Sequence, residues 1–267
     1  MSNVKYLFII ALSLLTSCGL RLKPFDLESQ REEIEIARYD RLQSRYLATG
    51  DYSALQEMNT EYPIETRTLI EKVLQIGEVV DPNISTKYLH FYQDSTLQSL
   101  ISDTEAEYAD MTDLNKRFNK SFDRLLKWIP SLPIPKIYAQ IGALDQSVII
   151  GNKTIGICLD KYLGTNYPLY LKYYTYQQRV SMTRAYIVPD CLVFYLLSVY
   201  PITQADKRSQ LERDLHMAKI MWTVNKAVNQ KLFKTKYVMM VDNYMRKHPD
   251  KDIEQVLLND DYTTLLP

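Results

Sequence analysis

The spacing of hydrophobic residues predicts one strand and then a series of helices in the first half of the chain. Residues 33–40 alternate polar side chains with Ile34 and Ile36, a period-two pattern that is typical of a half-buried strand. Residues 41–76 carry apolar side chains at helical spacing with two breaks, which predicts short helices. A longer helical tract is expected over about 94–128, where a continuous apolar stripe indicates a core face.

The pattern changes after a proline-rich segment, and the following residues favour strands. Residues 136–141, 147–150 and 154–160 are rich in β-branched side chains, and a glycine-and-asparagine turn at 151–153 joins the last two into a hairpin. The sequence therefore predicts an α+β fold, mainly helical, with a small, mostly antiparallel sheet of about four strands. Three later helical stretches are expected at about 183–199, 204–232 and 252–259.

An apolar run at residues 7–15 precedes this body. It is too short for a bilayer-spanning helix, which needs about 20 apolar residues, and Lys5 ahead of it is typical of an export signal. The residues LTSC that follow resemble the lipobox of bacterial lipoproteins, in which cleavage precedes the cysteine and diacylglycerol joins its sulfur. We therefore expect a signal peptide over 1–17 and a lipid on Cys18. A simple secretory signal with a chance cysteine is the alternative.

Composition narrows the function classes. The chain has 267 residues, with 32 Lys and Arg against 32 Asp and Glu, so no basic field would recruit nucleic acid. Besides Cys18 there are only Cys158 and Cys191, each inside an apolar stretch, where a small buried side chain is the usual role. A disulfide between these two cysteines stays open.

Several segments together resemble the GldB family of gliding motility lipoproteins of Bacteroidetes. The resemblance spans nearly the whole mature chain and implies an envelope lipoprotein that supports surface gliding and the linked protein-secretion machinery. It offers no catalytic residues to carry over. The matching segments, in order, are IEIARYDR, LQEMNTEYP, IPKIYAQIGALDQSVIIGNKTIGICLDKYLGTNYPLY and YQQRVSMTRAYIVPDCL.

The order of a strand, helices, three strands and a long helix also resembles the upper half of zincin-type zinc peptidases. The catalytic helix of those enzymes needs HExxH, because two imidazoles one turn apart bind the zinc and the glutamate activates its water. The corresponding helix, residues 186–195, has no histidine, and His90, His216 and His248 are solitary. No metal and no cofactor are therefore expected. A degenerate or divergent zincin-like metallopeptidase or hydrolase is the alternative to a non-catalytic envelope lipoprotein.

Acidic and tyrosine residues near the third strand form the candidate site, a groove for a ligand or partner. Asp160 closes this strand, and Asp190 begins a helix, where capping of backbone N–H groups competes with a ligand role. Tyr162 and Tyr167 belong to a tyrosine-dense segment that suits either a contact surface or core packing. Asp145 is a further acidic candidate.

The residues after Cys18 predict where the protein lies. We expect a lipid-anchored tether over 18–28 and a single GldB-like domain over 29–267. Surface lipoproteins of Bacteroidetes usually resemble one another in acidic residues after the lipidated cysteine, whereas this chain has Arg21 and Lys23 there. Gly19 follows Cys18, whereas enterobacterial lipoproteins that stay at the inner membrane have an aspartate at that position. These features favour the outer membrane, with the domain facing the periplasm.

Overall fold

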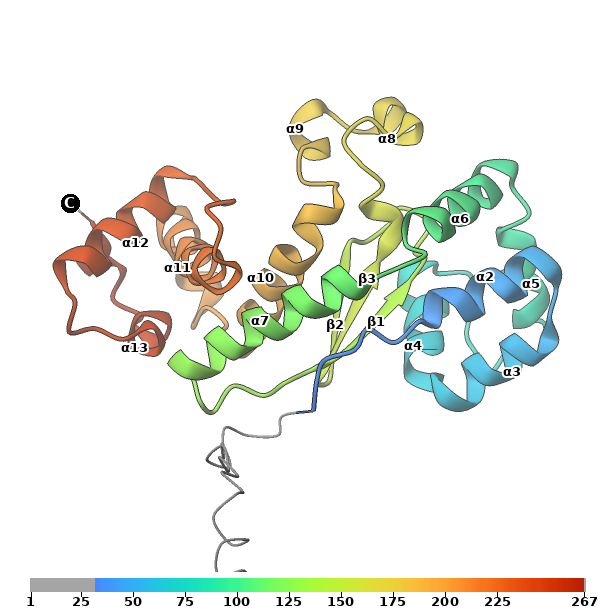
Figure 1. The fold of residues 1–267 in the computed structure, drawn as a ribbon, viewed down its shortest axis with the longest axis horizontal. Helices are drawn as coiled ribbons and strands as arrows, with labels where there is room; N and C mark the ends of the chain where they lie inside the picture. The colour runs from blue at the N-terminus through green and yellow to red at the C-terminus, as the bar shows by residue number, and fades with distance from the viewer. Residues whose placement is uncertain (1–31, 267) are drawn as a thin grey trace, which may run out of the picture. The chain divides into compact units, whose positions relative to one another are not determined.

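A three-stranded mixed sheet lies between helices (Figure 1). The computed structural model describes residues 32–266, so the expected signal peptide, Cys18 and the whole tether lie outside the described range. Residues from Ile34 onward form one compact unit. None of the helices between residues 32 and 266 is long and apolar enough to cross a bilayer.

The sheet differs from the expected one in strand number and direction. Strands β1 (Lys136–Gln140), β2 (Val148–Gly151) and β3 (Thr154–Cys158) have the order β1-β3-β2. The predicted β2–β3 hairpin is confirmed as antiparallel, but β3 pairs with β1 in parallel. Periodicity does not reveal strand order, and the largely buried β3 takes the central place. The prediction of a mostly antiparallel, four-stranded sheet was wrong, and a zincin-like arrangement is not confirmed.

The first expected strand is extended but forms only one bridge to β1. Ala37 donates its N–H to a β1 carbonyl oxygen (2.9 Å) in a single parallel bridge. The N–H groups of Ile34 and Ile36 are bound instead by side-chain amide oxygens, Asn119 at 2.9 Å and Asn115 at 3.2 Å. These amides stand in for a neighbouring strand, because any partner that satisfies a buried N–H can hold the backbone extended.

Short helices fill the region before the sheet, as the apolar spacing predicts. The first break falls at Gly50, which ends α2 with a φ of 70°, and Asp51 caps the next helix. The single tract expected over 94–128 is two helices, and Asp110 in the intervening turn accepts the N–H of Thr112 (2.8 Å). The elements are α2 (Tyr39–Thr49), α3 (Tyr52–Glu61), α4 (Pro63–Thr68), the π-helix η1 (Leu69–Val73), α5 (Ile84–Phe91), α6 (Ser95–Glu107) and α7 (Thr112–Trp128).

The second half is also helical, and its helices α8, α9 and α12 fall outside the stretches that the pattern predicts. The tract expected over 204–232 is shorter, because Ser209 and Glu212 form a capping box and Asn229 ends the helix in the left-handed conformation. Helix α12 follows where none is predicted. The elements are the 3₁₀ helix η2 (Leu159–Lys161), α8 (Pro168–Tyr173), α9 (Tyr176–Arg179), η3 (Arg184–Tyr186), α10 (Ile187–Val199), η4 (Ala205–Lys207), α11 (Gln210–Val228), α12 (Lys236–Lys247), α13 (Ile253–Leu258) and η5 (Tyr262–Leu265).

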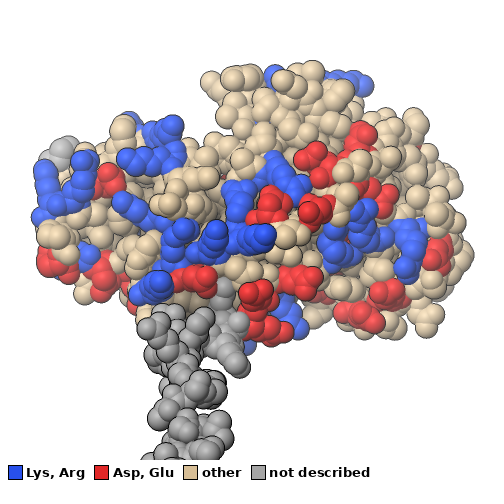
Figure 2. All heavy atoms as spheres, viewed as in Figure 1, with Lys and Arg blue, Asp and Glu red and all other residues tan. Residues whose placement is uncertain are grey.

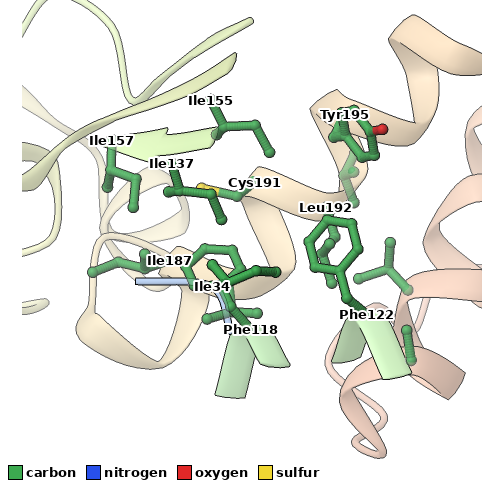
Figure 3. Packing of buried hydrophobic residues seen from close by; sticks show 14 of the residues in the cluster. Ile34, Phe118, Phe122, Ile137, Ile155, Ile157, Ile187, Cys191, Leu192 and Tyr195 are labelled. Atoms are coloured by element: carbon green, nitrogen blue, oxygen red, sulfur yellow. The ribbon is translucent and has the colours of Figure 1, made fainter. Parts of the chain in front are cut away.

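Hydrophobic clusters cover both faces of the sheet. On one face, Phe118 and Phe122 of α7 pack with Cys191 of α10 and with strand isoleucines such as Ile155 (Figure 3). On the other face, Tyr138 of β1 belongs to a cluster with buried residues of α2, α3 and α5. A third cluster joins α11, α12 and α13. The predicted apolar stripe of the α7 region is thus confirmed as a core face, and the class is a mainly helical α+β fold.

Candidate functional site

Asp160 lies in η2, just beyond the end of β3 and not in the strand as expected, and its carboxylate holds a neighbouring loop. The residue is fully buried. One carboxylate oxygen accepts the N–H of Gly142 (2.8 Å) and the other accepts the N–H of Leu144 (2.6 Å). Ala143 and Leu144 both have positive φ, a conformation that needs such support in residues other than glycine. Burial raises the pKa of Asp160, and the two N–H groups partly offset that rise.

Two tyrosines of the α8 segment anchor it to the same loop. The hydroxyl of Tyr170 donates to the backbone carbonyl oxygen of Asp160. The hydroxyl of Tyr174 donates to the carbonyl oxygen of Leu144 (3.1 Å), and Lys161 donates to both that oxygen (3.1 Å) and the Tyr174 hydroxyl (3.0 Å). Helix α8 is therefore fixed to the end of β3 by hydrogen bonds within the chain.

Asp190 binds a tyrosine hydroxyl, whereas the sequence favoured capping of backbone N–H groups. It lies in the first turn of α10, whose N-cap residue, Tyr186, has no side-chain cap. Its carboxylate accepts the hydroxyl of Tyr162 (3.0 Å), and the carbonyl oxygen of Tyr162 accepts the hydroxyl of Tyr108 (2.6 Å). Burial raises the pKa of Asp190 to about 7, and the Tyr162 hydrogen bond lowers it in part. We call Asp160, Tyr162, Tyr170 and Asp190 the carboxylate–tyrosine cluster.

Tyr167 is the one candidate that lines a surface groove. Its hydroxyl donates to Asp103 of α6 (2.8 Å), and its ring lies 5.0 Å from that of Tyr170. Two adjoining cavities, of about 340 and 520 Å³, share Asp103, Tyr167 and Pro168. Tyr167 thus contacts the cluster only at its edge. Asp145 is exposed on the loop that Asp160 holds, and its carboxylate makes none of these contacts.

Lys161 and Tyr108 complete the site, although sequence reasoning does not single them out. Lys161 directly follows Asp160 in one of the segments that resemble the GldB family, and that adjacency was the available signal. Tyr108 offered none, because it lies in the turn between α6 and α7, far from Tyr162 along the chain.

The histidines and cysteines of the described residues form neither a metal site nor a disulfide. In the described part of the chain, no group of three His, Cys, Asp or Glu side chains could hold a metal ion. His216 is buried between the Tyr200 carbonyl oxygen (2.9 Å) and the Tyr262 hydroxyl (3.0 Å). Cys158 and Cys191 are both free, and their prediction as buried apolar side chains is confirmed.

Helices α8 and α9 present an apolar outer side. Leu171, Tyr173 and Tyr176 are 55%, 62% and 67% exposed, and Val180 is 40% exposed. We call these four residues the α8–α9 surface. No Asp or Glu occurs between residues 161 and 189, and the projecting part of Figure 2 accordingly shows blue but no red.

The cations of this surface lie against its aromatic rings. The ammonium nitrogen of Lys172 lies 5.2 Å from the centre of the Tyr173 ring, and the guanidinium of Arg179 lies 5.8 Å from that of Tyr176. Such contacts keep charge and aromatic area together on one exposed side.

The fold and site define a mainly helical α+β protein with a small mixed sheet and a buried carboxylate–tyrosine cluster. The family model for gliding motility protein GldB, a lipoprotein family, matches residues 23–237, which include the whole sheet, the cluster and the α8–α9 surface. The chain belongs to the GldB family. No curated protein and no solved structure matches it.

Proposed function

We propose that the protein is a non-catalytic, lipid-anchored envelope component that supports gliding or the associated protein-secretion machinery. Family membership supports a role linked to gliding motility. The observation that carries the non-catalytic part is the pairing of polar groups around β3. Asp160 is fully buried, and both of its carboxylate oxygens are bound by backbone N–H groups of one neighbouring loop.

A catalytic acid or base must come within hydrogen-bonding reach of its substrate. Asp160 has no exposed surface, and Tyr170 above it is also fully buried. Their hydrogen bonds fix the base of α8, which is what a structural support requires. The cluster therefore serves to hold α8 in place.

The anchor part of the proposal concerns residues outside the described range. We propose lipidation of Cys18 and an outer-membrane position with the domain facing the periplasm. Two or more acyl chains on Cys18 would give stable membrane attachment. A serine at this position has no thiol to accept diacylglycerol. Cys18→Ser should therefore abolish labelling by radioactive fatty acid, and labelling at the wild-type level would contradict this assignment.

The α8–α9 surface is the proposed contact with an envelope partner protein. Tyrosines supply large contact area at low entropy cost and are enriched at the centres of protein interfaces. Exposed apolar side chains that lie together on one projecting element are typical of interaction sites.

A charge-introducing double variant tests this function. Leu171→Glu/Tyr176→Glu in the full-length lipoprotein should abolish gliding or secretion in the native host, with its amount and membrane fraction unchanged. The control is Ile64→Glu/Val80→Glu, which alters two residues that are 71% and 73% exposed elsewhere and should keep wild-type function. Wild-type function of the α8–α9 variant would overturn the proposed contact.

A further inference from the structure

A preformed pocket lies between α11 and α12. Its cavity has a volume of about 620 Å³, within the range of small-molecule sites. Apolar side chains form much of its lining, including Trp222 of α11, Phe233 of the connecting loop and Met239 of α12, which is 56% exposed. The family match ends at residue 237, so part of the α12 wall lies beyond the matched segment.

The loop that closes one end of this pocket is held by a buried amide. The Oδ1 atom of Asn225 accepts the N–H groups of Leu232 (3.0 Å) and Phe233 (3.1 Å), and its Nδ2 atom donates to the Phe233 carbonyl oxygen (2.8 Å). Thr235 then caps α12 by accepting the N–H of Val238. These bonds shape the pocket before any ligand arrives, which reduces the entropy cost of binding.

The charges of the pocket are unbalanced. Four cationic side chains line it, and its one carboxylate belongs to Asp242. Lys226 lies 3.6 Å and Arg246 lies 3.4 Å from that carboxylate. The indole N–H of Trp222 donates to it as well (2.9 Å), and this hydrogen bond is the main cause that lowers the pKa of Asp242. Asp242 is therefore ionised and already shared between two cations.

The other two cations of the pocket lie farther from Asp242, although the charge of Lys231 still helps to lower the pKa of that carboxyl. Lys231 and Lys234 are exposed, and no carboxylate of residues 32–266 lies within ion-pair distance of either ammonium group. Their two positive charges suit a ligand with two negative charges. A phosphomonoester has a charge of about −1.5 to −2 at pH 7, whereas a single carboxylate provides only one negative charge.

We propose that this α11–α12 pocket binds a phosphomonoester with an adjoining apolar group. The phosphate pairs with Lys231 and Lys234, while the apolar group lies against Phe233 and Met239. Lysine ammonium groups bind phosphate as point charges, and the partly apolar lining favours an organic ester over inorganic phosphate. The site is separate from the α8–α9 surface and does not depend on the function proposed for that surface.

Calorimetric titration of the full-length protein in a neutral detergent tests the proposal. Phenyl phosphate is the probe, because it joins a phosphate to an apolar ring and remains water-soluble. We expect its Kd to be at least about tenfold lower than that of inorganic phosphate, since burial of the ring adds more than about 1.4 kcal/mol. Benzyl alcohol, which lacks the charge, should not bind measurably. Equal affinities for phenyl phosphate and inorganic phosphate would overturn the role of the apolar lining.

Matched variants locate the site. Lys231→Gln/Lys234→Gln should raise the Kd of phenyl phosphate about tenfold or more, as expected for loss of charge-assisted contacts. Lys236→Gln/Lys247→Gln removes the same charge from the two ends of α12 outside the pocket and should change the Kd less than about twofold. Equal effects of both double variants, or no binding by the wild type, would overturn the proposal.

Discussion

The carboxylate–tyrosine cluster and the α11–α12 pocket differ in how their charged groups find partners. In the cluster, backbone N–H groups and tyrosine hydroxyls of the same chain bind Asp160 and Asp190. In the pocket, two lysines form no ion pair with a carboxylate of the described residues. The first arrangement stabilises the fold, whereas the second leaves binding capacity for another molecule. Acidic residues that attract notice in a sequence can therefore be structural, while exposed lysines mark the open site.

The largest expected effect on stability comes from a substitution in the carboxylate–tyrosine cluster. Asp160→Asn replaces an oxygen that accepts the Leu144 or Gly142 N–H with an amino group, which leaves a buried N–H unpaired. Such a loss costs about 2–4 kcal/mol of unfolding free energy. Denaturant unfolding should show it, while Asp145→Asn on the exposed part of the same loop should change stability by less than about 0.5 kcal/mol. Equal stability of both variants would mean that Asp160 does not hold the loop.

The second prediction concerns Asp190 and pH. Its pKa is raised to about 7 in the folded protein, so the folded state binds the proton more tightly than the unfolded state. This contribution to stability is complete below the usual aspartate pKa of about 3.9 and is lost as the pH rises through 7. Asp190→Asn, which cannot ionise, should match the wild type at pH 4 and exceed it at pH 8.

The expected gain for Asp190→Asn at pH 8 is about 1–3 kcal/mol, after allowance for the partial exposure of the carboxyl. Thermal unfolding across this pH range measures it. The Asp145→Asn protein is the control and should follow the wild type at every pH. A pH-independent difference between Asp190→Asn and the wild type would show that Asp190 is ionised in the folded protein.

The smallest expected effect on stability comes from substitutions in the α11–α12 pocket. Lys231→Gln/Lys234→Gln removes two exposed cations that form no ion pair, so the unfolding free energy should stay within about 0.5 kcal/mol of the wild type. Denaturant unfolding at low salt checks this, because any repulsion between the lysines is strongest there. A loss of more than about 1 kcal/mol would mean that these lysines stabilise the fold and are not free for a ligand.

Sequence patterns predict the local elements better than the contacts between them. The hairpin of β2 and β3 and the α7 core stripe follow from turn chemistry and helical periodicity. The first expected strand failed because amides of α7 replace a strand partner, and an amide 79 or 85 residues away leaves no local signal. Helix α12 was missed although its sequence carries the signal. Tyr237, Val241 and Tyr244 recur at helical spacing and pack in the third cluster.

The candidate site was predictable only in part, because its residues follow local patterns but its contacts are long-range. The sequence indicates Asp160, Tyr162 and Asp190 as polar residues near the end of a strand and the start of a helix. It does not reveal that Asp160 binds a loop with positive φ values, because the conformation of Ala143 and Leu144 depends on tertiary contacts. The α11–α12 pocket depends on α12 and therefore could not be predicted without that helix.

The most direct test of the account is function in the native host with Asp190→Asn as the sole copy of the protein. This variant keeps an oxygen that can accept the Tyr162 hydroxyl, but it cannot transfer a proton. If the cluster is structural, gliding or secretion should remain at the wild-type level, with normal amounts of protein in the membrane fraction. Loss of function in a stably folded, normally anchored Asp190→Asn protein would contradict the non-catalytic account.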